Sequence, residues 1–179
     1  MTLPEGIERV LFTEEQVAAR VMEVAAEIDR KYQGRDLKLI GVLKGSVFFL
    51  TALARALNVP VKIDFLAISS FGGGRAAQGM VRIAKDLDEP IQDEDVLLVE
   101  DIVDTGFTTR YLLQTLAGRG PRSLGICTLL DRNVRRIVQV PVDFRCFEIP
   151  DRFVVGCGLD CRQLYRNLGC IAVMNPDKQ

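Results

Sequence analysis

The stretch 96–110, VLLVEDIVDTGFTTR, joins an apolar run to three carboxylates and then to a glycine and small hydroxyl residues. The carboxylates are Glu100, Asp101 and Asp104. A carboxylate near a buried strand is costly to keep ionised unless a cation or a hydrogen-bond donor meets it. The stretch is therefore a candidate site for a ligand that supplies such a partner.

The residues after Asp104 are suited to hold a phosphate. The free backbone N–H groups at a helix start attract anions, and a glycine lets the backbone come close to them. The upstream carboxylates can hold sugar hydroxyls or magnesium, and one of them can exchange a proton. The spacing favours a site for a phosphorylated sugar, but a plain turn with solvated acids and a helix cap stays open as an alternative. The loop residues are Thr105, Gly106, Thr108 and Thr109.

Composition narrows the classes of function. The chain has 179 residues, of which 48% are hydrophobic, and a net charge of −1, so no basic field indicates nucleic acid or a membrane surface. It contains no histidine, so proton transfer near neutral pH must use another side chain or the substrate itself. Five cysteines without a CxxC pair or a signal peptide favour reduced thiols and a cytoplasmic location.

Hydrophobic periodicity predicts alternating strands and helices. The stretch 13–16 is a capping box that opens a helix ending near Gly34, and Ser46 would cap the next helix. The segment 69–79 is glycine-rich and is interpreted as a mobile loop. Predicted strands are 37–43, 61–68, 81–84, 96–99 and 124–130, and predicted helices are 14–34, 47–57 and 108–116.

This order predicts an α/β fold, a mainly parallel doubly wound sheet with helices on both faces. Residues 1–179 form a single domain in this interpretation, with a core at about 10–130 and a small irregular subdomain at about 131–179, to which the N-terminus could contribute. In that subdomain we expect strand-like pieces at 153–155 and 171–173, with a short helical turn near 162–165. Ligands of such sheets bind beyond the carboxyl ends of the strands, which is where the stretch at 100–109 is expected.

The stretch VLLVEDIVDTGFTT resembles the phosphoribosyl-pyrophosphate-binding motif of type I phosphoribosyltransferases. Three further stretches resemble the hypoxanthine (hypoxanthine-guanine) branch: GVLKGSVFF at 41–49, DFLAISSFGGG at 64–74 and FEIPDRFVVGCGLDCRQLYRNL at 147–168. The resemblance implies a magnesium-dependent purine-salvage enzyme that makes IMP, and also GMP, from the base and phosphoribosyl pyrophosphate. The irregular C-terminal subdomain would then be the hood that binds the base.

The resemblance implies a role for each matching residue around the sugar phosphate. Glu100 and Asp101 would contact the ribose hydroxyls, directly or through bound magnesium. Asp160 would hold a second magnesium ion, and Arg166 would contact pyrophosphate. The loop around the 5′-phosphate would comprise Thr105, Gly106, Phe107, Thr108 and Thr109. The pyrophosphate loop would comprise Leu43, Lys44 and Gly45 and contain a cis peptide bond, and Ser70 and Phe71 would belong to a lid.

At the base, the resemblance implies that Asp104 exchanges a proton with N7 of the purine. Phe153 would stack on the purine ring and Val154 would meet it through backbone groups. The family presents a lysine to the exocyclic O6, and the matching residue here is Arg132. Local alternatives are that Phe153 is a core residue, that Asp160 caps a turn and that Arg132 points into solvent.

Two other functions fit parts of the pattern. A related enzyme could prefer guanine or xanthine. The fold also serves nucleic-acid-binding regulators, which would want a basic face such as Arg132, Arg135 and Arg136 or an added domain. We expect small-molecule partners (a 6-oxopurine and phosphoribosyl pyrophosphate), no nucleic acid, no membrane, and a homodimer or homotetramer as the resemblance implies.

Overall fold

The computed structural model describes residues 4–70 and 81–178. The helices are α1 (Glu14–Lys31), α2 (Val47–Ala56) and α3 (Phe107–Ala117), and short 3-10 helices lie at Asn133–Arg135 and Pro176–Lys178. The strands are β1 (Ile7–Phe12), β2 (Leu37–Leu43), β3 (Val61–Ser70), β4 (Val81–Lys85), β5 (Asp95–Val103), β6 (Ser123–Asp131), β7 (Phe144–Glu148), β8 (Val154–Val155) and β9 (Ile171–Met174).

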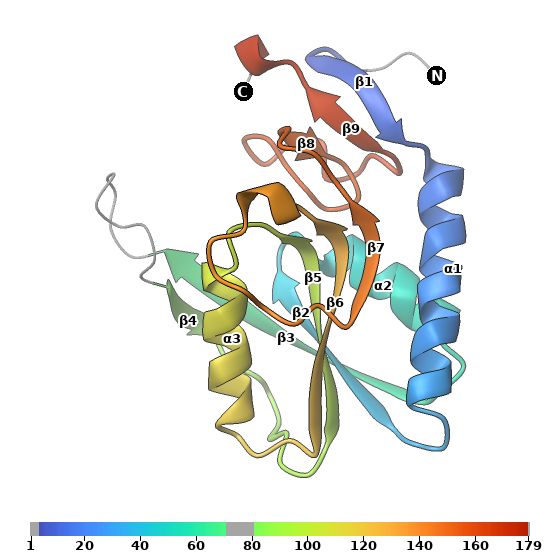
Figure 1. The fold of residues 1–179 in the computed structure, drawn as a ribbon, viewed down its shortest axis with the longest axis vertical. Coiled ribbons are helices and arrows are strands. Elements are labelled where there is room, and N and C mark those ends of the chain that lie inside the picture. The colour runs from blue at the N-terminus through green and yellow to red at the C-terminus, as the bar shows by residue number, and fades with distance from the viewer. Residues whose placement is uncertain (1–3, 71–80, 179) are drawn as a thin grey trace.

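The large sheet has the strand order β4-β3-β2-β5-β6-β7, and only the pair β3–β4 is antiparallel (Figure 1). Parallel neighbours need crossovers, and α2 connects β2 to β3 while α3 connects β5 to β6; α1 leads from β1 into β2. The mainly parallel, doubly wound sheet predicted from the sequence is thereby confirmed.

Helices cover both faces of this sheet, because successive strand residues point to opposite sides. Leu39 and Leu97 belong to a buried cluster with residues of α1 and α2. Their neighbours Ile40 and Leu98 belong to a second buried cluster with residues of α3. Figure 1 shows α3 on one side of the sheet and α1 and α2 on the other.

A second sheet lies at the carboxyl ends of the large-sheet strands and has the order β1-β9-β8 (Figure 1). It joins the N-terminal strand to the two C-terminal strands through antiparallel pairs. The sequence did not predict β1 or β7, and β7 adds the last strand to the large sheet. The division near residue 130 into core and hood stays a prediction.

Three local predictions were wrong. Ser46 does not cap α2, since its hydroxyl donates to the carbonyl of Val42 at 2.8 Å and receives no helix N–H. The residues near 162–165 are not helical, since Arg162, Gln163 and Tyr165 have φ of 52°, 68° and 73°. The strand predicted at 61–68 continues to residue 70, so the loop predicted at 69–79 begins later, and its part at 71–79 lies outside the described residues.

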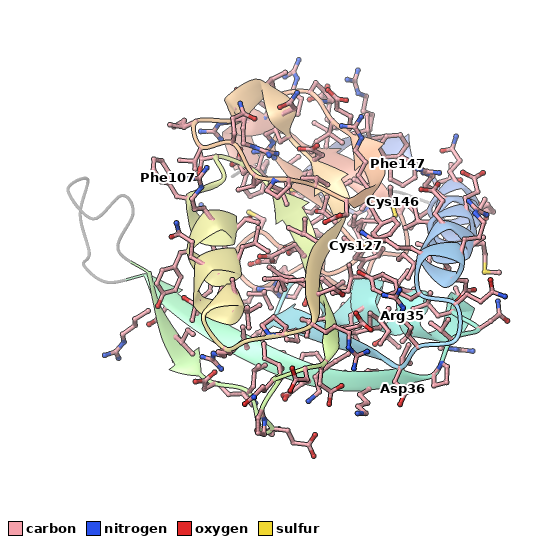
Figure 2. All side chains as sticks on the ribbon, turned by 60° about the horizontal axis from the view of Figure 1, so that its bottom comes forward. Arg35, Asp36, Phe107, Cys127, Cys146 and Phe147 are labelled. Carbon is pink, nitrogen blue, oxygen red and sulfur yellow. The ribbon has the colours of Figure 1, made fainter. Side chains whose placement is uncertain are left out.

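The five cysteines are free thiols. Cys127 and Cys146 lie on β6 and β7 in the buried cluster beneath α1 (Figure 2). Burial is the largest cause that raises the pKa of Cys146, to about 12, so this thiol is a packing group and not a nucleophile. None of the helices in the described ranges is both long enough and apolar enough to cross a membrane.

Candidate active site

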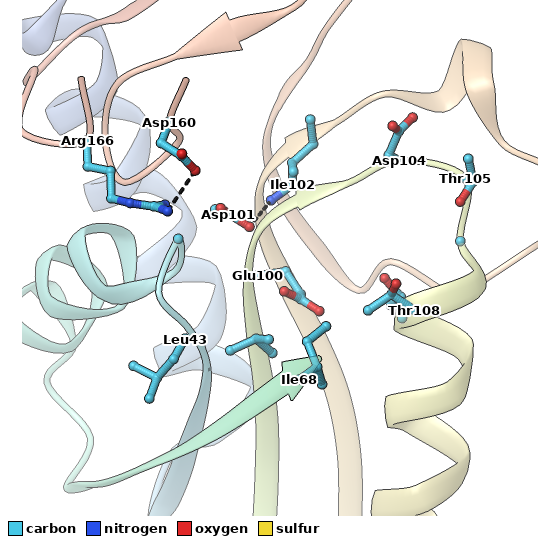
Figure 3. Close-up of a pocket in the computed structure, with 14 residues that line it drawn as sticks. Leu43, Ile68, Glu100, Asp101, Ile102, Asp104, Thr105, Thr108, Asp160 and Arg166 are labelled. Carbon is cyan, nitrogen blue, oxygen red and sulfur yellow. Dashed lines mark hydrogen bonds and ion pairs between the residues drawn. The ribbon is translucent and has the colours of Figure 1, made fainter. Parts of the chain in front are cut away.

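A cavity of about 380 Å³ opens at the carboxyl ends of β2, β3 and β5 (Figure 3). The cavity forms where β5 continues beyond the end of its pairing with β2. Pairing of β5 with β2 ends at Val99, whereas pairing with β6 continues to Val103. The sequence-predicted residues that line this cavity are Leu43, Gly45, Glu100, Asp101, Asp104, Thr105, Gly106, Thr108, Thr109, Asp160 and Arg166.

Glu100 and Asp101 lie inside β5, because this strand continues to Val103, four residues beyond the predicted end at Val99. Glu100 is 5% exposed, and its Oε1 is buried without a hydrogen-bond partner. Burial, and then the neighbouring Asp101 carboxylate, raise the pKa of Glu100 well above its usual value. Burial likewise raises the pKa of Asp101, although its Oδ1 accepts a hydrogen bond from the N–H of Ile102 at 2.9 Å. Glu100 and Asp101 are thus two buried carboxylates with few hydrogen-bond donors around them, and both face the cavity.

Gly45 allows the loop after β2 to approach this pair. A Cβ at Gly45 would lie 1.6 Å from Asp101 Oδ2, so any larger residue would displace the carboxylate. The peptide bond between Leu43 and Lys44 is cis, as the resemblance implied. Leu43 and Gly45 line the cavity, while Lys44 reaches Gln163 Oε1 at 3.5 Å.

The residues that the sequence predicted to bind an anion lie at the start of α3. Gly106 is the N-cap with φ 92°, and a Cβ there would lie 2.1 Å from the carbonyl oxygen of Val138. The N–H groups of Ile137 and Val138 both donate to the carbonyl of Thr105 at 2.9 Å, which fixes the loop from the outside. Thr105 and Thr108 line the cavity (Figure 3). Phe107 is 45% exposed and does not line the cavity.

Asp104 lies just beyond β5 and meets two arginines. Its Oδ2 lies 3.4 Å from Arg132 Nη1 and 3.6 Å from Arg135 Nη1. Its Oδ1 is buried without a hydrogen-bond partner. Arg132 is 7% exposed, so it does not point into solvent, and its Nη2 donates to the carbonyl of Arg152 at 2.7 Å.

Two further charged groups close the cavity on the side of the small sheet. Asp160 Oδ1 and Arg166 Nη2 form an ion pair at 2.7 Å (Figure 3). Asp160 Oδ2 also accepts the N–H of Gln163 at 2.8 Å, so it does cap a turn, though not a helical one. Arg166 Nη2 and Lys44 Nζ both contact Gln163 Oε1, at 3.2 Å and 3.5 Å. Gln163, which the sequence did not single out, therefore links the two predicted cations.

Phe153 and Val154 were predicted to bind the base together with Arg132, and these two lie on or beside the small sheet, whereas Arg132 follows β6 of the large sheet. Val154 is buried in β8, where it pairs with β9. Phe153 precedes it and is 40% exposed, which leaves its ring accessible. Ser70 is the last residue of β3, and Phe71 lies outside the described residues.

The sequence missed the apolar walls of the cavity. They are formed by Val42, Ile68 and Ile102. Val42 and Ile68 lie at or next to the ends of predicted strands, and that position in a parallel sheet is the signal that could have found them. Ile102 lies three residues beyond the predicted end at Val99, so the sequence would have found it only with the full length of β5.

The carboxylate oxygens in the cavity fit magnesium better than a cation that takes all of its ligands from the protein. Among the described residues, no group of three or more histidine, cysteine or acidic side chains is arranged to hold a metal ion. Magnesium is instead held by one or two carboxylates together with substrate phosphates and water. The unpartnered Oε1 of Glu100, next to Asp101, offers such oxygen ligands.

The burial of Glu100 predicts an effect on stability. Glu100→Gln keeps the shape but removes a charge that is buried beside Asp101, so we expect a higher melting temperature of the ligand-free, metal-free protein at pH 7. The expected rise is a few degrees, since about 1 kcal/mol shifts a chain of this size by roughly 2–4 °C. Glu94→Gln is the control, because Glu94 pairs with Lys62 at 3.0 Å and gains nothing from neutralisation. An unchanged or lower melting temperature for Glu100→Gln would contradict the prediction.

A doubly wound parallel sheet with acidic pairs and a helix start at its strand ends defines a class of α/β enzymes for phosphorylated ligands. Residues 11–162 match the family described as Phosphoribosyl transferase domain. The chain is 47% identical to the hypoxanthine-guanine phosphoribosyltransferase of Mycobacterium avium, over 97% of this chain and 88% of the relative. It is 48% identical to the hypoxanthine phosphoribosyltransferase of Haemophilus influenzae, over 90% and 92% of the two chains.

The fold agrees with these relatives. A crystal structure of a hypoxanthine phosphoribosyltransferase from Staphylococcus aureus has a TM-score of 0.92 and 41% identity, covering 96% of this chain and 94% of that one. The protein belongs to the phosphoribosyltransferase family.

Proposed function

We propose that this protein is a purine-salvage enzyme that converts hypoxanthine, and also guanine, with phosphoribosyl pyrophosphate to IMP or GMP and pyrophosphate. One observation carries the proposal: the same cavity holds the anion-binding start of α3, the Glu100–Asp101 pair and Asp104. The names of the relatives agree with this activity.

In this proposal the sugar phosphate spans the cavity. The backbone N–H groups at the start of α3, with the hydroxyls of Thr105, Thr108 and Thr109, bind the 5′-phosphate. Glu100 and Asp101 bind the ribose hydroxyls from inside β5. Lys44 and Arg166, which share Gln163, bind the pyrophosphate and stabilise its charge as it departs.

Magnesium is the cofactor of the proposal. When bound, it would neutralise the negative charge of pyrophosphate. Glu100 and Asp101 are the oxygen ligands we assign to one magnesium ion, and Asp160 is the ligand we assign to a second. Asp160 pairs with Arg166, so to hold a magnesium ion it would have to share or leave this ion pair.

The base is held on the side of the small sheet. The exposed ring of Phe153 stacks on the purine, and Val154 meets it through its backbone. The purine N9 attacks C1 of the ribose as the bond to pyrophosphate breaks, and the N7 proton passes to Asp104. A lid that contains Ser70 and Phe71 would exclude water from the cation-like ribose.

The cellular location, oligomeric state and partners that we propose rest on the sequence and on the family resemblance. We place it in the cytoplasm, because its five thiols are free and no CxxC pair is present. We expect a homodimer or homotetramer, small-molecule substrates, and no nucleic acid or membrane as partner.

The test is turnover of a panel of bases. Initial rates with hypoxanthine, guanine, xanthine, adenine and uracil, each with phosphoribosyl pyrophosphate and magnesium, should show that hypoxanthine and guanine react and that adenine and uracil do not. A preference for xanthine would support the related xanthine-preferring enzyme instead. No turnover of any base would overturn the proposal.

Arg132 is proposed to read the purine O6, because its guanidinium is buried beside Asp104 and its Nε is a buried donor without a partner. Arg132→Ala should raise KM for hypoxanthine and guanine by an amount equal to about 1–3 kcal/mol, the usual value of a charge-assisted hydrogen bond. Arg132→Lys should recover much of it, because lysine still donates to one oxygen. Unchanged KM values in Arg132→Ala would show that this arginine does not contact the base.

A further inference from the structure

Arg132 and Arg135 hold the same oxygen of the Asp104 carboxylate. Arg132 Nη1 lies 3.4 Å from Asp104 Oδ2, and Arg135 Nη1 lies 3.6 Å from it. The other oxygen, Oδ1, is buried and has no hydrogen-bond partner. Because two cations confine Oδ2, Oδ1 is the oxygen that is left to receive a proton from the base.

Both arginines also contact the segment that leads into the small sheet. Arg132 Nη2 donates to the carbonyl of Arg152 at 2.7 Å, and Arg135 Nε lies 3.7 Å from Asp151 Oδ1. Residues 151 and 152 directly precede Phe153, the proposed stacking residue. Each arginine therefore connects the carboxylate at the end of β5 to the loop that would carry the base.

The two arginines differ in their access to a substrate. Arg132 is buried and already has a proposed contact with the base, whereas the Arg135 side chain is 49% exposed and does not line the cavity. We propose that Arg135 is a positioning residue, which orients Asp104 against the purine by pairing with Asp104 and Asp151 at the same time. This inference rests on the proposed function, since it assigns the support of the proton-exchanging group.

The chemical step shows why orientation matters. The lone pair of purine N9 forms the bond to C1, the C1–O bond breaks and its electron pair leaves with pyrophosphate, and the N7 proton moves to Asp104 Oδ1. This transfer depends on the distance and angle between N7 and the carboxylate, so a tilted Asp104 slows it. An exposed ion pair adds little to stability, so loss of Arg135 should change turnover and leave the melting temperature nearly unchanged.

The experiment is a double-mutant cycle on kcat. Arg135→Ala should lower kcat about two- to fivefold, the range expected for one partly exposed ion pair, with KM for phosphoribosyl pyrophosphate unchanged. In the Asp104→Asn background the same substitution should have no further effect, because the group that it orients is gone. Arg135→Lys should keep at least half of the parent kcat. The matched control is Arg119→Ala, which removes a 2.7 Å ion pair with Asp86 and should leave kcat unchanged.

Three results would overturn the inference while the parent enzyme turns over hypoxanthine. They are an unchanged kcat in Arg135→Ala, an equal loss of kcat in the Asp104→Asn background, and a kcat of Arg135→Lys as low as that of Arg135→Ala. A parent enzyme that does not turn over hypoxanthine would overturn the proposed function, and this inference with it.

Discussion

Asp104→Asn should lower kcat by roughly 10²–10⁴-fold, the usual contribution of a positioned general acid or base. The amide keeps the shape and can still face the base, but it cannot take the N7 proton. Binding of phosphoribosyl pyrophosphate should stay close to that of the parent, because the phosphate is assigned to the start of α3 and the ribose to Glu100 and Asp101. The measurement is kcat with saturating hypoxanthine, together with the Kd of phosphoribosyl pyrophosphate.

The control for this substitution is Asp86→Asn. Asp86 also pairs with an arginine, Arg119, but that arginine follows the C-terminal end of α3, and the cavity lies at the other end of this helix. Turnover of Asp104→Asn within a few-fold of the parent would remove Asp104 from the proton step. A large loss of phosphoribosyl-pyrophosphate affinity would instead assign Asp104 to ribose or metal binding.

Removal of divalent metal should abolish turnover, and magnesium should restore it. Pyrophosphate carries several negative charges that a hard cation must balance, and the acidic side chains of the cavity supply oxygen ligands for it. The measurement is initial rate against free magnesium after treatment with a chelator. Asp160→Asn should raise the magnesium concentration for half-maximal rate, since Asp160 is the proposed ligand of the second magnesium ion.

An enzyme with full turnover in chelator would contradict the assignment of all three metal ligands. An unchanged magnesium dependence in Asp160→Asn would contradict the role of Asp160 alone. The matched control is Asp151→Asn, which removes an exposed carboxylate that lies 3.7 Å from Arg135 and does not line the cavity. Its magnesium dependence should equal that of the parent.

The sequence predicted the large sheet well, because its strands carry their own signals. The run at 96–99 is apolar throughout, and the capping box at Thr13 is present with both of its hydrogen bonds. The order of strands and helices then left few topologies for a parallel sheet. The position of the carboxylates at the carboxyl ends of the strands followed from that topology.

The small sheet could not be predicted in the same way, because its pairs join distant parts of the chain. Strand β1 pairs with β9, so Ile7 and Met174 are neighbours although no local pattern links them. Strand β7 did leave a signal, since Phe144 and Cys146 are buried and Arg145 between them is exposed, as in an alternating strand. The turn at 162–165 was mistaken for helix because positive φ at residues other than glycine has no simple sequence signal.

The candidate site likewise has one part that local sequence predicts and another that depends on contacts between distant residues. The stretch 100–109 is continuous in sequence, so its residue types and spacing were sufficient to predict an anion site beside carboxylates. The contacts of Asp104 with Arg132 and Arg135 bring together residues about 30 positions apart, and the positions of these side chains depend on where β6 ends and the following 3-10 helix begins. Such contacts depend on tertiary packing, so the spacing of residues along the sequence does not predict them.

A crystal structure of the protein with bound IMP would test all of the proposed contacts together. We predict the 5′-phosphate on the backbone N–H groups at residues 105–109 and the ribose hydroxyls against Glu100 and Asp101. We predict the purine between Phe153 and Asp104, with N7 nearest to the oxygen that Arg132 and Arg135 do not hold. A phosphate bound anywhere other than the start of α3, or a purine that does not reach Asp104, would contradict this prediction.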